Sequence, residues 1–130
     1  MASFAINITG APYSTGAPLS ALRFTRAALA AGHSIQRVFL SQDGVHLAST
    51  LTCPPQDEIH LTRAWQEVAA HYQLELVVCV AAALRRGLLD EKEAQRHGLA
   101  QHNLAAGFTL AGLGQLVDSL SQADRTLTFN

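Results

Sequence analysis

Residues Leu74–Gly87 read LELVVCVAAALRRG, an apolar run that reaches a cysteine and continues into two arginines. The run has no alternation of polar and apolar residues, which is typical of a strand covered on both faces in a parallel sheet. We predict that this strand ends at Cys79. Beyond it, the small residues predict a turn that leads into Arg85 and Arg86.

The rest of the chain alternates between strand and helix patterns. Further strands are predicted at residues 4–9, 34–40, 108–110 and 125–129. Apolar residues at helical spacing predict helices over 19–31, 59–72 and 113–121. A short polar helix is predicted over 90–96, with Asp90 as its N-cap. Gly32 is predicted to cap the first helix, Asp43-Gly44 to form a turn and residues 45–57 to form a loop.

Strands that alternate with helices predict an α/β fold. We expect a single domain over residues 1–130, built on a doubly wound, mostly parallel sheet of about five strands flanked by helices. A chain of 130 residues is long enough to bury a core of its own.

The chain has few charged residues. They make up 15% of the sequence, against an average of about 25% in soluble domains. We therefore expect part of the monomer surface to be apolar and to be covered by other subunits. The formal net charge of −1 provides no electrostatic attraction for nucleic acid, so direct binding of RNA or DNA is not expected.

We expect neither a membrane span nor an export signal. No apolar run approaches the roughly 18–20 residues that cross a bilayer, and no positive region followed by an apolar stretch opens the sequence. The two cysteines, Cys53 and Cys79, are too few for a disulfide framework and are interpreted as free thiols. These features predict a cytoplasmic protein.

Cys79 is the candidate catalytic residue. Chemistry in open α/β sheets gathers at the carboxyl ends of strands, where we expect Cys79 to lie with backbone N–H groups ahead of it and guanidinium groups nearby. Such surroundings favour a nucleophilic thiolate. The alternative interpretation is a buried cysteine that packs as a small hydrophobic residue. Because no motif places a general base near it, sulfur transfer between thiolates suits Cys79 better than acyl transfer.

The other reactive side chains give weaker signals. Cys53 lies in a proline-flanked loop and is interpreted as incidental, with a resolving thiol as the alternative. The cysteines and the six scattered histidines lack the paired spacing of a zinc site, so no metal is expected. His46 and His102 fall in predicted loops and could approach the thiol. Arg85 and Arg86 are candidates for stabilising the thiolate or docking a partner, or else form the solvated end of a short helix.

Two glycine-containing segments give little support for a phosphate site. Thr9–Tyr13 follows the first strand but lacks the spacing of a dinucleotide fingerprint or a P-loop. Gly112–Gly114 is better explained by a helix that packs close to the sheet. A nucleotide cofactor is therefore not expected.

On these residues, the chain resembles the DsrE-like family and, within it, the TusD-type subunits of sulfur-relay complexes. The resemblance covers essentially the whole chain, and its most specific part is CVAAALRRG at residues 79–87. The other matching stretches are the helix around Trp65, GFTLAGLG at 107–114, Ala123-Asp124-Arg125, Arg37-Val38-Phe39, Asp43-Gly44-Val45, Leu51-Thr52 and Pro54-Pro55. Cys53 departs from the pattern, in which another residue is expected.

The resemblance implies a persulfide on Cys79, the only catalytic position carried over from the family. It implies assembly with TusB-like and TusC-like subunits as a dimer of heterotrimers. Sulfur would arrive from a TusA-like donor and pass to a TusE-like acceptor, toward 2-thiolation of the wobble uridine in tRNA. A DsrE-like subunit of dissimilatory sulfur oxidation is the alternative that the resemblance leaves open.

Two functions of other classes are alternatives to sulfur transfer. A non-catalytic scaffold subunit would share the fold, since a fold alone does not confer activity, but Cys79 in a matching segment argues against it. A small-molecule or nucleotide-binding module would use the crevice at the strand ends. The absence of a glycine fingerprint argues against that module.

Overall fold

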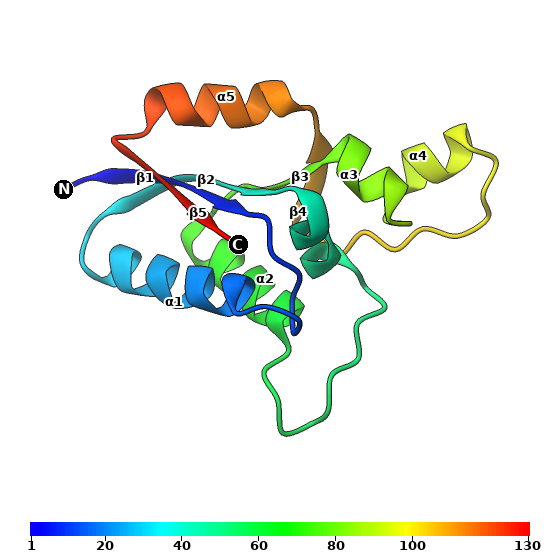
Figure 1. The fold of residues 1–130 in the computed structure, drawn as a ribbon, viewed down its shortest axis with the longest axis horizontal. Coiled ribbons are helices and arrows are strands. Elements are labelled where there is room, and N and C mark those ends of the chain that lie inside the picture. Colours follow the sequence, from blue (N-terminus) through cyan, green and yellow to red (C-terminus); the bar gives the residue numbers. More distant parts are fainter.

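Five parallel strands form one sheet through the middle of the molecule (Figure 1). The computed structural model describes residues 1–130, and the strand order is β4-β3-β2-β1-β5. The strands are β1 (Ser3–Ile8), β2 (Ser34–Leu40), β3 (Leu76–Cys79), β4 (Phe108–Ala111) and β5 (Arg125–Phe129). All four neighbouring pairs are parallel. The predicted α/β fold is confirmed, and every predicted strand is present.

Helices cover both faces of the sheet (Figure 1). On one face α1 (Ala17–Ala30) packs beside α2 (Leu61–Tyr72), and α5 (Leu113–Gln122) lies on the other. The short helices α3 (Val80–Arg85) and α4 (Glu91–Arg96) follow β3, and the 3-10 helix η1 (Gln42–Ala48) follows β2. The chain winds from β1 to β4 in one direction and then crosses back to place β5 beside β1. The sheet is therefore doubly wound.

Two helix ends follow directly from the sequence. Gly32 has a φ of +88°, which costs a glycine little, and its N–H donates to the carbonyl of Leu29 over 3.1 Å at the end of α1. At the start of α4, the Asp90 Oδ1 accepts a hydrogen bond of 2.8 Å from the N–H of Glu93. Both predicted caps are confirmed.

Two segments differ from the prediction. The turn expected after Cys79 is the first turn of α3, because the alanine-rich segment has a high helix propensity. The turn and loop expected from Asp43 onward begin instead with η1. Val45 and Leu47 of η1 are almost fully buried, so packing against the sheet stabilises this helix where the sequence has no helical periodicity.

The core depends on β3 and on one tryptophan. All four residues of β3 are buried, as expected for a strand covered on both faces. Trp65 of α2 is fully buried, and its indole Nε1–H donates to the carbonyl of Pro18 over 3.2 Å. This bond joins α2 to the first turn of α1.

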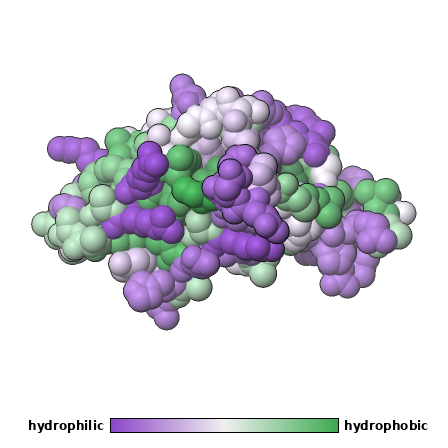
Figure 2. All heavy atoms as spheres, turned by 90° about the horizontal axis from the view of Figure 1, so that it is seen from below, coloured by the Kyte–Doolittle hydropathy of each residue, from purple (hydrophilic) through white to green (hydrophobic).

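The surface is mixed on one side and apolar on α5. Figure 2 shows the side on which α1 and α2 lie, where hydrophilic residues interrupt the hydrophobic ones. On the opposite side of the sheet, α5 exposes Leu113, Val117 and Leu120, whose spacing places them along one stripe of the helix. The apolar surface expected from the composition is thus present on α5. None of the helices combines the length and the hydropathy that a membrane span requires.

Gly44 allows η1 to approach the end of β1. Its N–H lies 3.1 Å from the carbonyl oxygen of Thr9, and a Cβ at this position would overlap the carbonyl group of Ile8. We expect Gly44→Ala to lower the free energy of unfolding by about 1–3 kcal/mol, measured by urea denaturation. Gly114→Ala is the control, since no atom lies within 4 Å of a Cβ there, and should change stability by less than about 1 kcal/mol. Equal losses in the two variants would contradict this role for Gly44.

Candidate functional site

A cavity of about 380 Å³ opens at the carboxyl ends of β1, β2 and β3. Asn7 and Thr9 contribute from the end of β1, and Ser41 and Gln42 from the segment after β2. Cys79 is the last residue of β3. The remaining lining residues come from α3, from the residue that follows it and from α5: Ala82, Arg85, Arg86, Leu113 and Leu116. The parallel order of the sheet brings these segments together because all its strands end at the same edge.

Cys79 is one of the residues that line this cavity. Cys79 is 7% exposed, and it directly precedes the first residue of α3. It therefore packs against the core and still borders open space.

Neutral polar groups form the wall toward β1 and β2. The Ser41 hydroxyl donates to the Asn7 side-chain oxygen over 3.3 Å, so the two strand ends are linked at this wall. Gln42 has a φ of +50°, an uncommon conformation for a residue other than glycine, and it turns the chain from β2 into η1. No carboxylate or histidine lines the cavity.

The two arginines at the end of α3 have different environments. Arg86 is partly buried, donates to Asp43 Oδ1 over 2.8 Å and donates to the carbonyl of Ala82 over 3.1 Å. The hydrogen bond and charge of Arg86 lower the pKa of Asp43 below its usual range, and His46 makes a smaller contribution in the same direction. Arg85 is exposed, lines the cavity and makes no ion pair or side-chain hydrogen bond. The structure thus brings both arginines to the thiol's cavity, and only Arg85 has an unbalanced charge.

The histidines and the second cysteine lie outside this cavity. His46 is partly buried in η1 beside the Asp43–Arg86 pair, and it does not line the cavity. His102 lines a different hollow. Cys53 is exposed in its loop, where the Sγ lies 3.6 Å from the carbonyl oxygen of Leu51. No group of three or more His, Cys, Asp or Glu side chains is placed to hold a metal ion.

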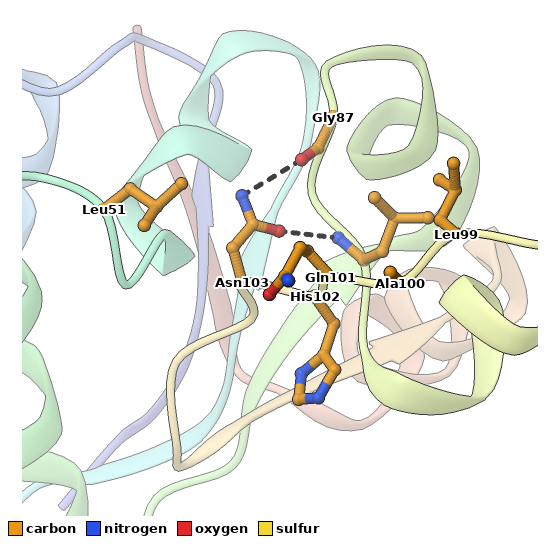
Figure 3. A pocket seen from close by; sticks show the side chains of 8 residues that line it. Leu51, Gly87, Leu99, Ala100, Gln101, His102 and Asn103 are labelled. Carbon is orange, nitrogen blue, oxygen red and sulfur yellow. Dashed lines mark hydrogen bonds between the residues drawn. The ribbon is translucent and has the colours of Figure 1, made fainter.

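A second hollow, of about 470 Å³, lies between the loop at Leu51 and the segment after α4 (Figure 3). Asn103 fixes this segment, because its side chain donates to the carbonyl of Gly87 over 3.0 Å and accepts from the N–H of Leu89 over 3.0 Å. The other groups that line the hollow are mostly apolar side chains or backbone, and His102 has the one titratable side chain among them. The hollow therefore offers no set of groups for catalysis.

Sequence reasoning did not identify the residues of the polar wall, Asn7, Ser41 and Gln42, or the contribution of Leu116. The sequence could have indicated Ser41 and Gln42 as site residues, because they directly follow the predicted second strand. Thr9 and Leu113, from the two segments considered as phosphate loops, also line the cavity. They contribute a hydroxyl and an apolar side chain there.

Comparison with known proteins gives close relatives. The DsrE/DsrF-like family matches residues 2–129. Over 126 residues, covering 97% of both chains, the sequence is 49% identical to the DsrE protein of Allochromatium vinosum, which is named as a sulfurtransferase. It is 48% identical over 126 residues, again covering 97% of both chains, to the sulfurtransferase TusD homolog of Aliivibrio fischeri.

The fold also has a counterpart among solved structures. The crystal structure of the ychN protein from E. coli superimposes with a TM-score of 0.75 and 21% identity, covering 99% of this chain and all of that one. Because the family match spans nearly every residue and two relatives are about half identical to the sequence, this chain belongs to the DsrE/DsrF-like family.

Proposed function

We propose that this chain is a sulfurtransferase whose single domain, residues 1–130, carries sulfane sulfur as a persulfide on Cys79. The position of the thiol is the observation that supports this proposal. Cys79 ends a buried strand, borders a cavity and lies in a wall shared with an unpaired arginine. The two relatives that carry the name sulfurtransferase agree with this chemistry.

The transfer consists of two thiol exchanges. The Cys79 thiolate attacks the outer sulfur of a donor persulfide, R–S–SH, and a bond forms between that sulfur and Cys79 Sγ. The donor S–S bond breaks, and its electron pair leaves on the donor sulfur as a thiolate. An acceptor thiolate then attacks the same outer sulfur, and Cys79 leaves as a thiolate. The proton of the outer sulfur moves with it, no net oxidation occurs, and no general base is required.

Partners follow from the TusD-type likeness. We propose that the chain acts in the cytoplasm in a dimer of heterotrimers with TusB-like and TusC-like subunits, between a TusA-like donor and a TusE-like acceptor. The exposed stripe of Leu113, Val117 and Leu120 on α5 supports such an assembly, since a contiguous apolar surface of this kind is typical of a contact with protein.

The pathway served by this transfer is proposed to be 2-thiolation of the wobble uridine in tRNA. The DsrE relative, at 49% identity, supports dissimilatory sulfur oxidation as the second candidate. Deletion of the gene distinguishes the two pathways. Loss of 2-thiouridine derivatives from hydrolysed tRNA would support thiolation, and unchanged tRNA with impaired oxidation of stored sulfur would support the second candidate.

Persulfide loading tests the proposed chemistry. After incubation with a persulfide donor, the native chain should gain about 32 Da, the mass of one sulfur, on the peptide that contains Cys79. Cys53→Ser should load as the parent does, because Cys53 lies outside the cavity. Cys79→Ser should not load. Equal loading of the parent and Cys79→Ser would show that sulfur resides elsewhere and would overturn the proposal.

A further inference from the structure

The charge of the Cys79 cavity comes from one side chain. Its ionisable lining residues are Cys79, Arg85 and Arg86, and no carboxylate lines it. The charge of Arg86 is balanced by Asp43 at 2.8 Å. Arg85 has no charged partner and no side-chain hydrogen bond, so it leaves the cavity with a net positive charge.

The helix α3 places this charge beside the cavity. Ala82, Arg85 and Arg86 are spaced three and four residues apart, so they share one face of the turn, and all three line the cavity. The Asp43–Arg86 pair ties the end of α3 to η1, which fixes the backbone that carries Arg85.

Sulfur exchange brings negative charges to this place. In each exchange a thiolate attacks a sulfur that is itself bonded to a developing thiolate, so two negative charges meet in the cavity and repel one another. A guanidinium beside the cavity attracts an incoming anion and offsets this repulsion. An exposed arginine without a partner is suited to this role because no internal ion pair has to break first.

We infer that Arg85 is the anion-recognising residue of the site, which attracts the incoming thiolate of a sulfur carrier and stabilises the thiolate that leaves. This inference rests on the proposed function for the identity of the anion. Arg85 attracts and orients the incoming group, and the bond changes occur at Cys79. Arg86 has a different role, since it holds α3 against η1.

The test compares two alkylating reagents of similar size and different charge. Iodoacetate is an anion and iodoacetamide is neutral, and both react with a thiolate. The rates are measured on the folded chain in a Cys53→Ser background, so that Cys79 is the only thiol. The ratio of the iodoacetate rate to the iodoacetamide rate then reports the electrostatic attraction at Cys79, largely independent of the fraction of thiolate.

Arg85→Gln should lower this ratio by about 5–10-fold at low ionic strength, Arg85→Lys should retain most of it, and salt should reduce the difference. The control is Arg26→Gln, which removes the same charge from a different place. Arg26 is exposed on α1, and α1 lies on the opposite face of the sheet from α5. An unchanged ratio in Arg85→Gln, or an equal fall in Arg26→Gln, would overturn the inference. Since the test needs no persulfide, a chain that shows the charge effect but never loads sulfur would refute the proposed function and leave Arg85 as an anion-recognising residue.

Discussion

Cells in which Cys79→Ser replaces the parent chain are expected to lose the sulfur product of the pathway, by about a hundredfold or more. A hydroxyl does not form a persulfide, so the first exchange has no acceptor atom. The product is measured by mass spectrometry of tRNA nucleosides, or as oxidised sulfur if gene deletion assigns the chain to that pathway. Cys53→Ser is the matched control and should retain the parent level.

The stability of the same variants separates catalysis from folding. Cys79 is 7% exposed, so a serine hydroxyl there costs about 1–3 kcal/mol unless it finds a partner. Cys79→Ala avoids that buried hydroxyl and should also abolish the product. If both variants kept the product while replacement of Leu113 and Val117 by Ser abolished it, the chain would act as a scaffold.

Trp65→Ala is expected to cost about 3–5 kcal/mol of unfolding free energy. Trp65 is fully buried, and its removal leaves a large cavity between α2 and α1 and removes the hydrogen bond from the indole Nε1–H to the carbonyl of Pro18. The free energy of unfolding of a folded domain is about 5–15 kcal/mol, so this loss would remove much of the stability of the protein. Chemical denaturation followed by circular dichroism measures this loss.

Two variants isolate the causes of that effect. Trp65→Phe retains much of the apolar volume and loses the indole hydrogen bond, so an intermediate loss is expected. Tyr72 lies on the same helix and is 42% exposed, so Tyr72→Ala should cost less than about 1 kcal/mol. A loss in Tyr72→Ala as large as in Trp65→Ala would show that helix propensity, rather than burial of Trp65, limits stability.

The strands were the most predictable part of the fold. The end of β3 at Cys79 is visible because the valine-rich stretch gives way to a run of alanines just beyond it, and β5 is bounded by polar residues on both sides. The helix η1 was not predictable, since its apolar residues are buried by the sheet and Gly44 is needed for a close approach to β1. Local periodicity carries no information on such contacts.

The candidate site was predictable only in part. Cys79 follows from its strand end, but Asn7 and Ser41 join it only because β1, β2 and β3 are neighbours in the sheet. The different roles of Arg85 and Arg86 depend on Asp43, which is far from them in the sequence and meets Arg86 through the packing of η1. The spacing of residues within one segment of the sequence indicates neither which strands are neighbours nor that Asp43 pairs with Arg86.

The most direct test follows sulfur from Cys79 to an acceptor. The chain is first loaded with a persulfide, freed of donor and mixed with a purified acceptor protein that has a single reactive thiol. The mass gain of about 32 Da should leave the Cys79 peptide at the rate at which it appears on the acceptor, one sulfur for one. Sulfur that reaches the acceptor without loss from Cys79, or a Cys79 persulfide that the acceptor never discharges, would contradict a relay through this thiol.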